Sequence, residues 1–159
     1  MIEHLHDYAI PAAYAVLPAP MKSEAATAML LAIALQESKA RYRHQLGGPA
    51  RGFWQFEAGG GVQGVLTHPA TQMHARSALN LLCYPASLTV NVIHGAIEHN
   101  DALAAVFARL LLWSLPQALP VSTDDAGAWD QYMAAWRPGR PHRSTWAPNY
   151  AVAWSMVQV

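Results

Sequence analysis

The segment from Ala25 to Leu35 constrains the fold more than any other part of the chain. Its residues are nearly all Ala, Leu, Met or Ile, which are strong helix formers. A helix without a polar face has to be covered by other elements on every side. The segment is also shorter than the roughly 18 to 20 apolar residues of a membrane span. We therefore predict a central helix of a globular protein, with Ser23 as its N-cap.

Apolar residues recur at helical spacing along most of the remaining chain, and clusters of Pro or Gly separate these segments. The side chains of Ser87, Asn100 and Thr123 or Asp124 stand where N-caps are needed. Besides the central helix, we predict helices at about 3–16, 69–82, 87–99, 101–115, 123–136 and 149–157.

The stretch from Lys39 to Thr67 differs from the rest, because it holds seven of the ten glycines. We predict a loop there, with room for a short hairpin, and a second loop from Arg137 to Pro148. With neither an internal repeat nor a linker in the sequence, residues 1–159 are expected to form a single compact domain. The predicted fold class is all-α, or mainly helical α+β.

Charge and cysteine content exclude several classes of function. Lys and Arg balance Asp and Glu at 10 each, so no excess of positive charge favours nucleic acid. A lone cysteine, Cys83, rules out an intramolecular disulfide. Since the eight histidines follow no recognisable zinc spacing, we predict no metal and no cofactor. The first residues lack the layout of a signal peptide, which predicts synthesis in the cytoplasm; we expect no membrane insertion and favour a monomer.

Glu37 is the strongest candidate for catalysis. It follows the apolar helix directly and precedes, by eighteen positions, Gln55 in a Gly-rich and aromatic segment. A carboxyl group at such a position is partly desolvated, which raises its pKa and lets it hold a proton near neutral pH. Glycosidic bond cleavage requires an acid of this kind.

Two segments resemble the signature of the lysozyme-like lytic transglycosylases and their goose-type lysozyme relatives. The first is 31–38, which ends in Glu37-Ser38, and the second is Gly52-Phe53-Trp54-Gln55-Phe56. In that family a helix ends in Glu-Ser, and a Gly-Leu-Met-Gln-Ile segment follows after a loop of about this length. The first segment supplies the family's catalytic Glu, whereas Phe53 and Trp54 replace Leu and Met.

Two later segments fall in the family's order. Trp136-Arg137-Pro138-Gly139 corresponds to an aromatic-Asn-x-Gly element, with Arg137 in place of Asn. Asn149-Tyr150 corresponds to the start of a helix whose Tyr faces the catalytic Glu. The resemblance implies a lysozyme-like domain that binds peptidoglycan glycan strands. Its implied substrate-binding residues are Ser38, Gly52, Phe53, Trp54, Gln55, Trp136 and Tyr150.

The resemblance also implies a reaction. In lytic transglycosylases a single Glu acts first as acid and then as base, while the 6-hydroxyl of the sugar attacks and closes a 1,6-anhydro ring. Glu37 would cleave the MurNAc to GlcNAc linkage in this way. The chain further resembles phage or prophage wall-degrading proteins, which reach the periplasmic cell wall by holin-assisted release or as part of a virion.

Other interpretations of the same residues stay open. Glu57 would be the second carboxylate of a hydrolytic muramidase, or simply a solvated loop charge. Trp54 and Tyr150 fit a hydrophobic core as well as a binding site, and Ser38 can end its helix through local backbone bonding. A third class is a non-catalytic phage structural protein that keeps the lysozyme-like shape.

Overall fold

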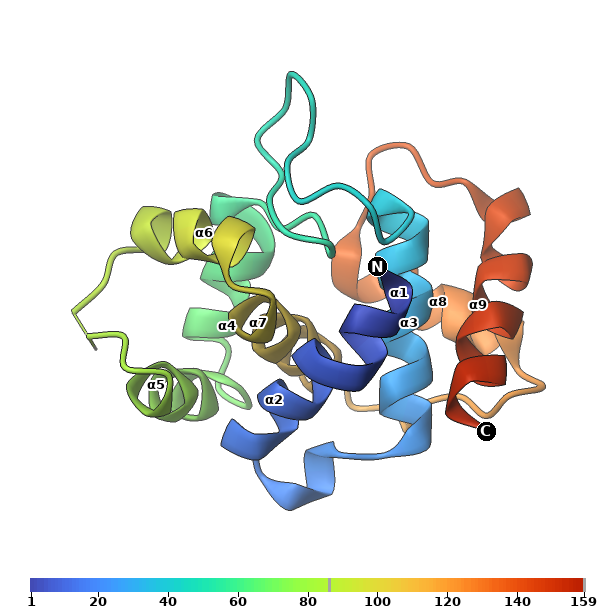
Figure 1. The fold of residues 1–159 in the computed structure, drawn as a ribbon, viewed down its shortest axis with the longest axis horizontal. Helices are drawn as coiled ribbons and strands as arrows, with labels where there is room; N and C mark the ends of the chain where they lie inside the picture. The colour runs from blue at the N-terminus through green and yellow to red at the C-terminus, as the bar shows by residue number, and fades with distance from the viewer. Residues whose placement is uncertain (86, 159) are drawn as a thin grey trace.

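Helix α3 (Glu24–Ser38) runs through the middle of the protein, as its apolar sequence predicts (Figure 1). The computed structural model describes residues 1–85 and 87–158. Every side chain from Ala28 to Ala34 is fully buried. Ser23 caps the helix, since its Oγ accepts a hydrogen bond of 3.0 Å from the Ala26 backbone N–H. A cap of this kind stabilises a helix by about 1 kcal/mol.

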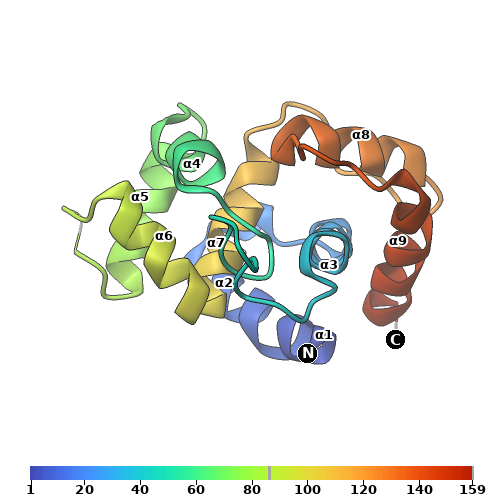
Figure 2. The same cartoon turned by 90° about the horizontal axis from the view of Figure 1, so that it is seen from above.

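The other helices surround α3 in two groups. On one side lie α8 (Asp125–Trp136) and α9 (Arg143–Val157), and α9 packs along the length of α3 (Figure 2). On the other side lies α7 (Asp101–Trp113), a second buried helix whose N-cap is Asn100. The remaining helices pack around α7: α1 (Ile2–His4), a π-helical turn at Leu5–Ala9, α2 (Ile10–Val16), α4 (Gln63–Thr67), α5 (Gln72–Leu81) and α6 (Val90–His99).

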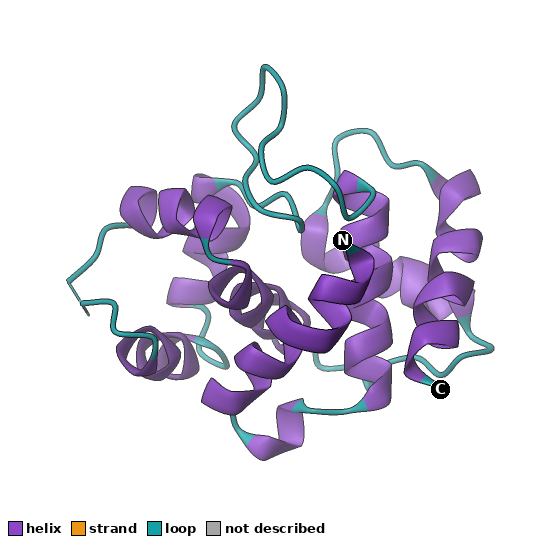
Figure 3. Cartoon of the chain, viewed as in Figure 1, coloured by secondary structure: helices purple, strands orange, loops and turns teal. Residues whose placement is uncertain are grey.

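The prediction of a mostly helical fold is confirmed. Within the described residues the chain forms helices and loops but no strand (Figure 3). Where a short hairpin was allowed for, only two isolated antiparallel bridges form, between His44 and Arg51 and between Arg51 and Phe56. None of the described helices combines the length and the apolar character needed to cross a membrane.

Several boundaries differ from the prediction. Helix α6 begins at Val90 with Thr89 as its cap, rather than at Ser87. The glycine run was predicted as loop, yet Ala58–Val62 forms a π-helical turn that leads into α4. Burial of Val62 and Val65 against the core stabilises this helical segment despite its glycines.

The start of the last helix differs most from the prediction. Helix α9 begins at Arg143, whereas we predicted loop up to Pro148 and a helix from Asn149. Pro148 therefore lies inside a helix, where it removes one backbone hydrogen bond. Tertiary packing outweighs this loss, because the first turn places Trp146 in the core with no exposed surface.

Candidate functional site

Glu37 lies in the last turn of α3 and lines a cleft of about 1020 Å³. The end of α3 forms the floor. The Gly-rich segment and α4 form one wall, and the end of α8 with the connection to α9 forms the other. The cleft thus opens where the central helix ends, between the two groups of helices. Its position agrees with the prediction that Glu37 borders a loop region rich in glycine and aromatic residues.

The Glu37 carboxyl group is held by Tyr132 of α8. The Tyr132 hydroxyl donates a hydrogen bond of 2.6 Å to Oε1 of Glu37. Burial raises the pKa of Glu37 to about 7, because an ionised carboxylate loses hydration there. The hydrogen bond from Tyr132 acts in the opposite direction, since it stabilises the carboxylate. At neutral pH, Glu37 is therefore present in both the protonated and the ionised form.

Tyr132 is fixed in turn by aromatic neighbours. Its ring stacks on Trp146 of α9, with centroids 5.0 Å apart and planes inclined by 14°. Trp129 and Trp136, on the same helix, contact it from either side at centroid distances of 5.3 Å and 6.4 Å. Burial also raises the pKa of Tyr132, so the phenol stays protonated and acts as the donor toward Glu37. The acid is thus positioned by a layer of packed aromatic rings between α8 and α9. This aromatic layer consists of Trp129, Tyr132, Trp136, Trp146 and Tyr150.

Three further predicted residues line the same cleft: Gln55, Glu57 and Trp136. Gln55 occupies a left-handed backbone conformation with φ 50°, and its Nε2 donates to the Gly52 carbonyl at 2.9 Å. Trp136 is anchored through Nε1, which donates to the Trp54 carbonyl at 2.9 Å. Glu57 is exposed. The structure thus brings together Glu37, Gln55, Glu57 and Trp136 from three separate segments.

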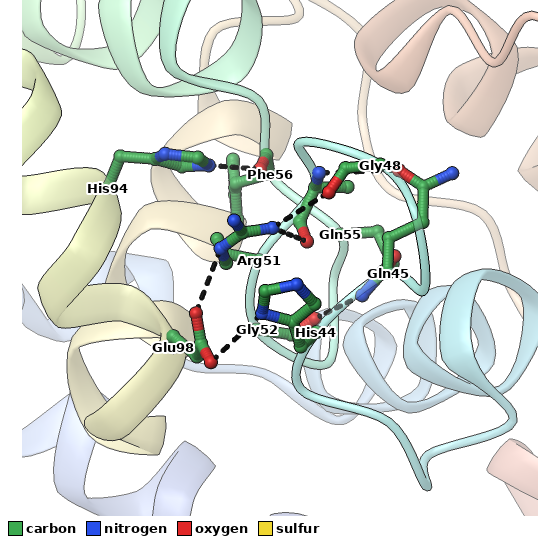
Figure 4. A network of polar contacts seen from close by, with 10 residues as sticks. His44, Gln45, Gly48, Arg51, Gly52, Gln55, Phe56, His94 and Glu98 are labelled. Carbon is green, nitrogen blue, oxygen red and sulfur yellow. Dashed lines mark hydrogen bonds and ion pairs between the residues drawn. The ribbon is translucent and has the colours of Figure 1, made fainter.

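A polar network ties the turn that carries Gln55 to helix α6 (Figure 4). Arg51 forms an ion pair of 2.8 Å with Glu98, which also contacts His44 at 3.1 Å. From the same helix, His94 Nε2 donates to the Phe56 carbonyl at 2.7 Å. These contacts hold the segment on both sides of Gln55, so its side chain is presented at a fixed place in the cleft.

Four residues predicted to bind substrate lie instead beneath the cleft: Ser38, Gly52, Phe53 and Trp54. Phe53 and Trp54 are fully buried and do not line the cleft. Trp54 Nε1 donates to the Leu30 carbonyl at 2.8 Å, and Ser38 Oγ donates to the carbonyls of Ala34 at 3.1 Å and Phe53 at 2.7 Å. These residues dock the loop on α3 and support the site from below.

The backbone geometry of Gly52 explains why this position of the turn requires glycine. Its φ of 74° is in the left-handed region. A Cβ atom there would lie 2.8 Å from Cγ2 of Ile97 and 3.2 Å from the Ile97 carbonyl oxygen. Only glycine lets the turn approach α6 this closely. Gly52 therefore sets the position of the turn rather than contacting a ligand.

Tyr150 does not face Glu37, which corrects its predicted place. It is buried in α9, and its hydroxyl donates to the carbonyls of Val121 at 3.0 Å and Pro120 at 3.2 Å. Because α9 begins at Arg143, Tyr150 falls within the aromatic layer, stacked on Trp146. Tyr132 contacts the acid instead. The sequence places Tyr132 on one helix face with Trp129 and Trp136, but Tyr150 has an equivalent pattern with Trp146 and Trp154, so the spacing alone does not select Tyr132.

Glu57 is the one carboxylate besides Glu37 among the described residues that line the cleft. The described residues contain no group of three or more His, Cys, Asp or Glu side chains arranged to hold a metal ion. The groups that the cleft offers are a partly protonated carboxyl group and its polar and aromatic neighbours.

Comparison with known proteins adds no family to this description. No family model, no curated protein and no solved structure matches the chain. A function is therefore inferred from the geometry of the cleft and from the sequence motifs that contribute to it.

The hydrogen bond between Tyr132 and Glu37 allows a first prediction. In the Tyr132→Phe variant, the carboxylate loses its donor, so the pKa of Glu37 rises above about 7. The basic limb of the pH profile of any reaction that needs protonated Glu37 then moves to higher pH, and the maximal rate falls by about tenfold. A pH-rate profile of both proteins tests this, and an unchanged basic limb would show that Tyr132 does not act on Glu37.

Proposed function

We propose that this protein cleaves the glycosidic bond between MurNAc and GlcNAc in peptidoglycan, with Glu37 as general acid and then general base. The observation that carries the proposal is the position of Glu37, a partly buried carboxyl group at the floor of a large cleft, where burial raises its pKa to about 7. Such a group can give a proton to a leaving oxygen at neutral pH and later accept one. The cleft lies at the upper end of the roughly 300 to 1000 Å³ range of ligand pockets, which leaves room for several sugar rings.

The proposed reaction has two steps. Glu37 first transfers its proton to the glycosidic oxygen, and the bond from that oxygen to the anomeric carbon of MurNAc breaks. The MurNAc 6-hydroxyl then attacks the same carbon and gives its proton to Glu37, which closes a 1,6-anhydro ring and restores the acid. Tyr132 stabilises the carboxylate between the steps through its hydrogen bond of 2.6 Å to Oε1.

The groups around Glu37 support this role. Gln55 offers amide atoms for sugar hydroxyls, and Trp136 offers part of an aromatic face. The resemblance to lytic transglycosylases implies a tyrosine that faces the acid; here Tyr132 makes such a contact, although it precedes the Trp136 segment in the chain and the resemblance had matched Tyr150. As the same resemblance implies, the protein would act on the periplasmic wall after holin-assisted release or as a virion component.

A hydrolytic muramidase is the second candidate, because Glu57 lines the same cleft. In that mechanism a second carboxylate activates water or forms a covalent intermediate, and the product has a reducing MurNAc end. The exposure of Glu57 favours the first candidate, since a solvated carboxylate is less constrained in position.

Mass spectrometry of digested sacculi decides between the two routes. We expect muropeptides that end in 1,6-anhydro-MurNAc, which are lighter by one water than hydrolysis products. We also expect the Glu57→Gln variant to release the same products at a rate within about threefold of the unsubstituted protein, because a single acid is enough. Reducing MurNAc ends, together with loss of activity in Glu57→Gln, would instead establish the muramidase.

A further inference from the structure

The connection between α8 and α9 brings two arginines to the cleft. Arg137 and Arg140 both line it. Within the described residues neither forms an ion pair, whereas Arg43, Arg51 and Arg143 each contact a carboxylate. The polar contact found for Arg137 is a long hydrogen bond of 3.3 Å from Nε to the Ala134 carbonyl. Both guanidinium groups are thus available to a ligand in the cleft.

Hydrogen bonds with Gln36 hold the α9 end of this connection next to Glu37, the proposed catalytic acid. Gln36, the residue before Glu37, donates from Nε2 to the His142 carbonyl at 2.9 Å. Its Oε1 accepts hydrogen bonds from Thr145 Oγ1 at 3.0 Å and from Asn149 Nδ2 at 2.9 Å. The far end of the connection is therefore tied to the same turn of α3 that carries Glu37.

The near end of the connection is fixed as well. Trp136 is anchored by its hydrogen bond to the Trp54 carbonyl, and Arg137 ends α8 in the left-handed conformation with φ 49°. Pro138 and Pro141 restrict the backbone between the two ends. The arginines are carried by a segment held at both ends, which lowers the entropy lost when they bind a ligand.

The charges in the cleft favour an anion. Two arginines share it with Glu57 and with a Glu37 that is only partly ionised at neutral pH. The cleft is therefore positive when Glu37 carries its proton, which is the form that the proposed reaction needs. A carboxylate is the matching partner, since the guanidinium group binds it through two parallel hydrogen bonds.

We propose that Arg137 and Arg140 form a subsite for a carboxylate group of the glycan strand, and that this subsite selects acidic glycans over neutral ones. The inference rests on the function proposed above and adds a substrate class to it. Two carboxylates of peptidoglycan share this chemistry: the lactyl carboxylate of MurNAc, which is free only where the peptide stem is absent, and the acidic groups of the stem itself, which is joined to the lactyl group by an amide bond. A neutral polymer of GlcNAc offers neither.

Binding measurements on the Glu37→Gln variant test this without turnover. Isothermal titration would use three probes: chitotetraose, a GlcNAc-MurNAc tetrasaccharide without peptide, and the same tetrasaccharide with its peptide stems. We expect a carboxylate-bearing probe to bind at least about tenfold more tightly than chitotetraose. The preference should shrink in about 0.5 M NaCl, which screens exposed charges. Tighter binding already without peptide assigns the lactyl group, and tighter binding only with peptide assigns the stem.

Variants of the arginines supply the control. Adding Arg137→Gln and Arg140→Gln should abolish the preference and leave chitotetraose binding unchanged, whereas Arg137→Lys with Arg140→Lys should keep only part of it, because the charge remains but the paired hydrogen bonds are lost. Arg76→Gln, an exposed arginine of α5 outside the cleft, should have no effect. Thermal unfolding of each variant checks that the fold is retained.

The outcomes separate the two proposals. If all three probes bind with equal affinity, or if the double Gln variant keeps the preference, the carboxylate subsite is wrong and the glycan-cleaving function stands. If none of the probes binds to Glu37→Gln at millimolar concentration, both proposals are wrong. A preference for chitotetraose would likewise overturn the subsite alone.

Discussion

Replacing Glu37 by Gln is expected to lower the rate of peptidoglycan digestion by at least about a hundredfold, the contribution typical of a general acid. Gln keeps the size of the side chain and can still accept the hydrogen bond that Tyr132 donates. The change therefore removes the transferable proton and little else. The decrease in turbidity of purified sacculi measures this loss, with gel zymography as a second readout.

The matched control lies at the other end of the same helix. Glu24 stands in the first turn of α3 and is exposed, so Glu24→Gln makes the same chemical change far from the cleft. It should digest sacculi at the normal rate. Equal clearing by the unsubstituted protein and Glu37→Gln, or clearing by neither, would remove Glu37 from the catalytic role and favour a non-catalytic protein.

The same substitution is expected to stabilise the fold, and only at high pH. The pKa of Glu37 is about 7 in the folded protein and 4.5 for the free side chain. Between these values the folded protein holds a proton that the unfolded chain has lost, so the free energy of unfolding falls as pH rises through this window. Above pH 7 the ionised carboxylate lowers stability by about 2 kcal/mol, allowing for the hydration it keeps at the cleft.

The amide introduced by the substitution would carry no charge to desolvate at any pH. Glu37→Gln should therefore unfold with the same midpoint as the unsubstituted protein near pH 4, and about 4 to 8 °C above it near pH 8. Thermal unfolding followed by circular dichroism at several pH values measures the difference. A difference that does not change between pH 4 and pH 8 would contradict the raised pKa, whereas Glu24→Gln should show no such trend.

The two results together would show that Glu37 lowers the stability of the fold while it supports activity. A residue whose removal stabilises the protein and abolishes activity is retained for its chemistry, since packing alone favours the neutral amide. Loss of activity without a stability gain at high pH would indicate that Glu37 titrates nearer its ordinary pKa and that the proton is delivered by another route.

Much of the helical framework is predictable because it depends on local sequence. Ser23, Asn100 and Asp124 act as N-caps where their side chains predict it. The last helix was predicted with the wrong start, because Pro148 and the charged residues before it favour a loop locally. Burial of Trp146 in the aromatic layer outweighs that preference. This burial depends on residues far away in the chain, such as Tyr132.

By itself, the sequence determined that an apolar helix would occupy the centre and that Glu37 would stand at its end beside a Gly-rich loop. Burial raises the pKa of this carboxyl group, as its position after the apolar helix predicts. Only the tertiary structure decided which tyrosine meets the acid and which aromatic rings lie in the cleft. Tyr132 and Tyr150 are both flanked by tryptophans on helices, so local pattern does not distinguish them. The packing of α8 and α9 on α3 does, because it turns Tyr132 toward Glu37 and encloses Tyr150 in the core.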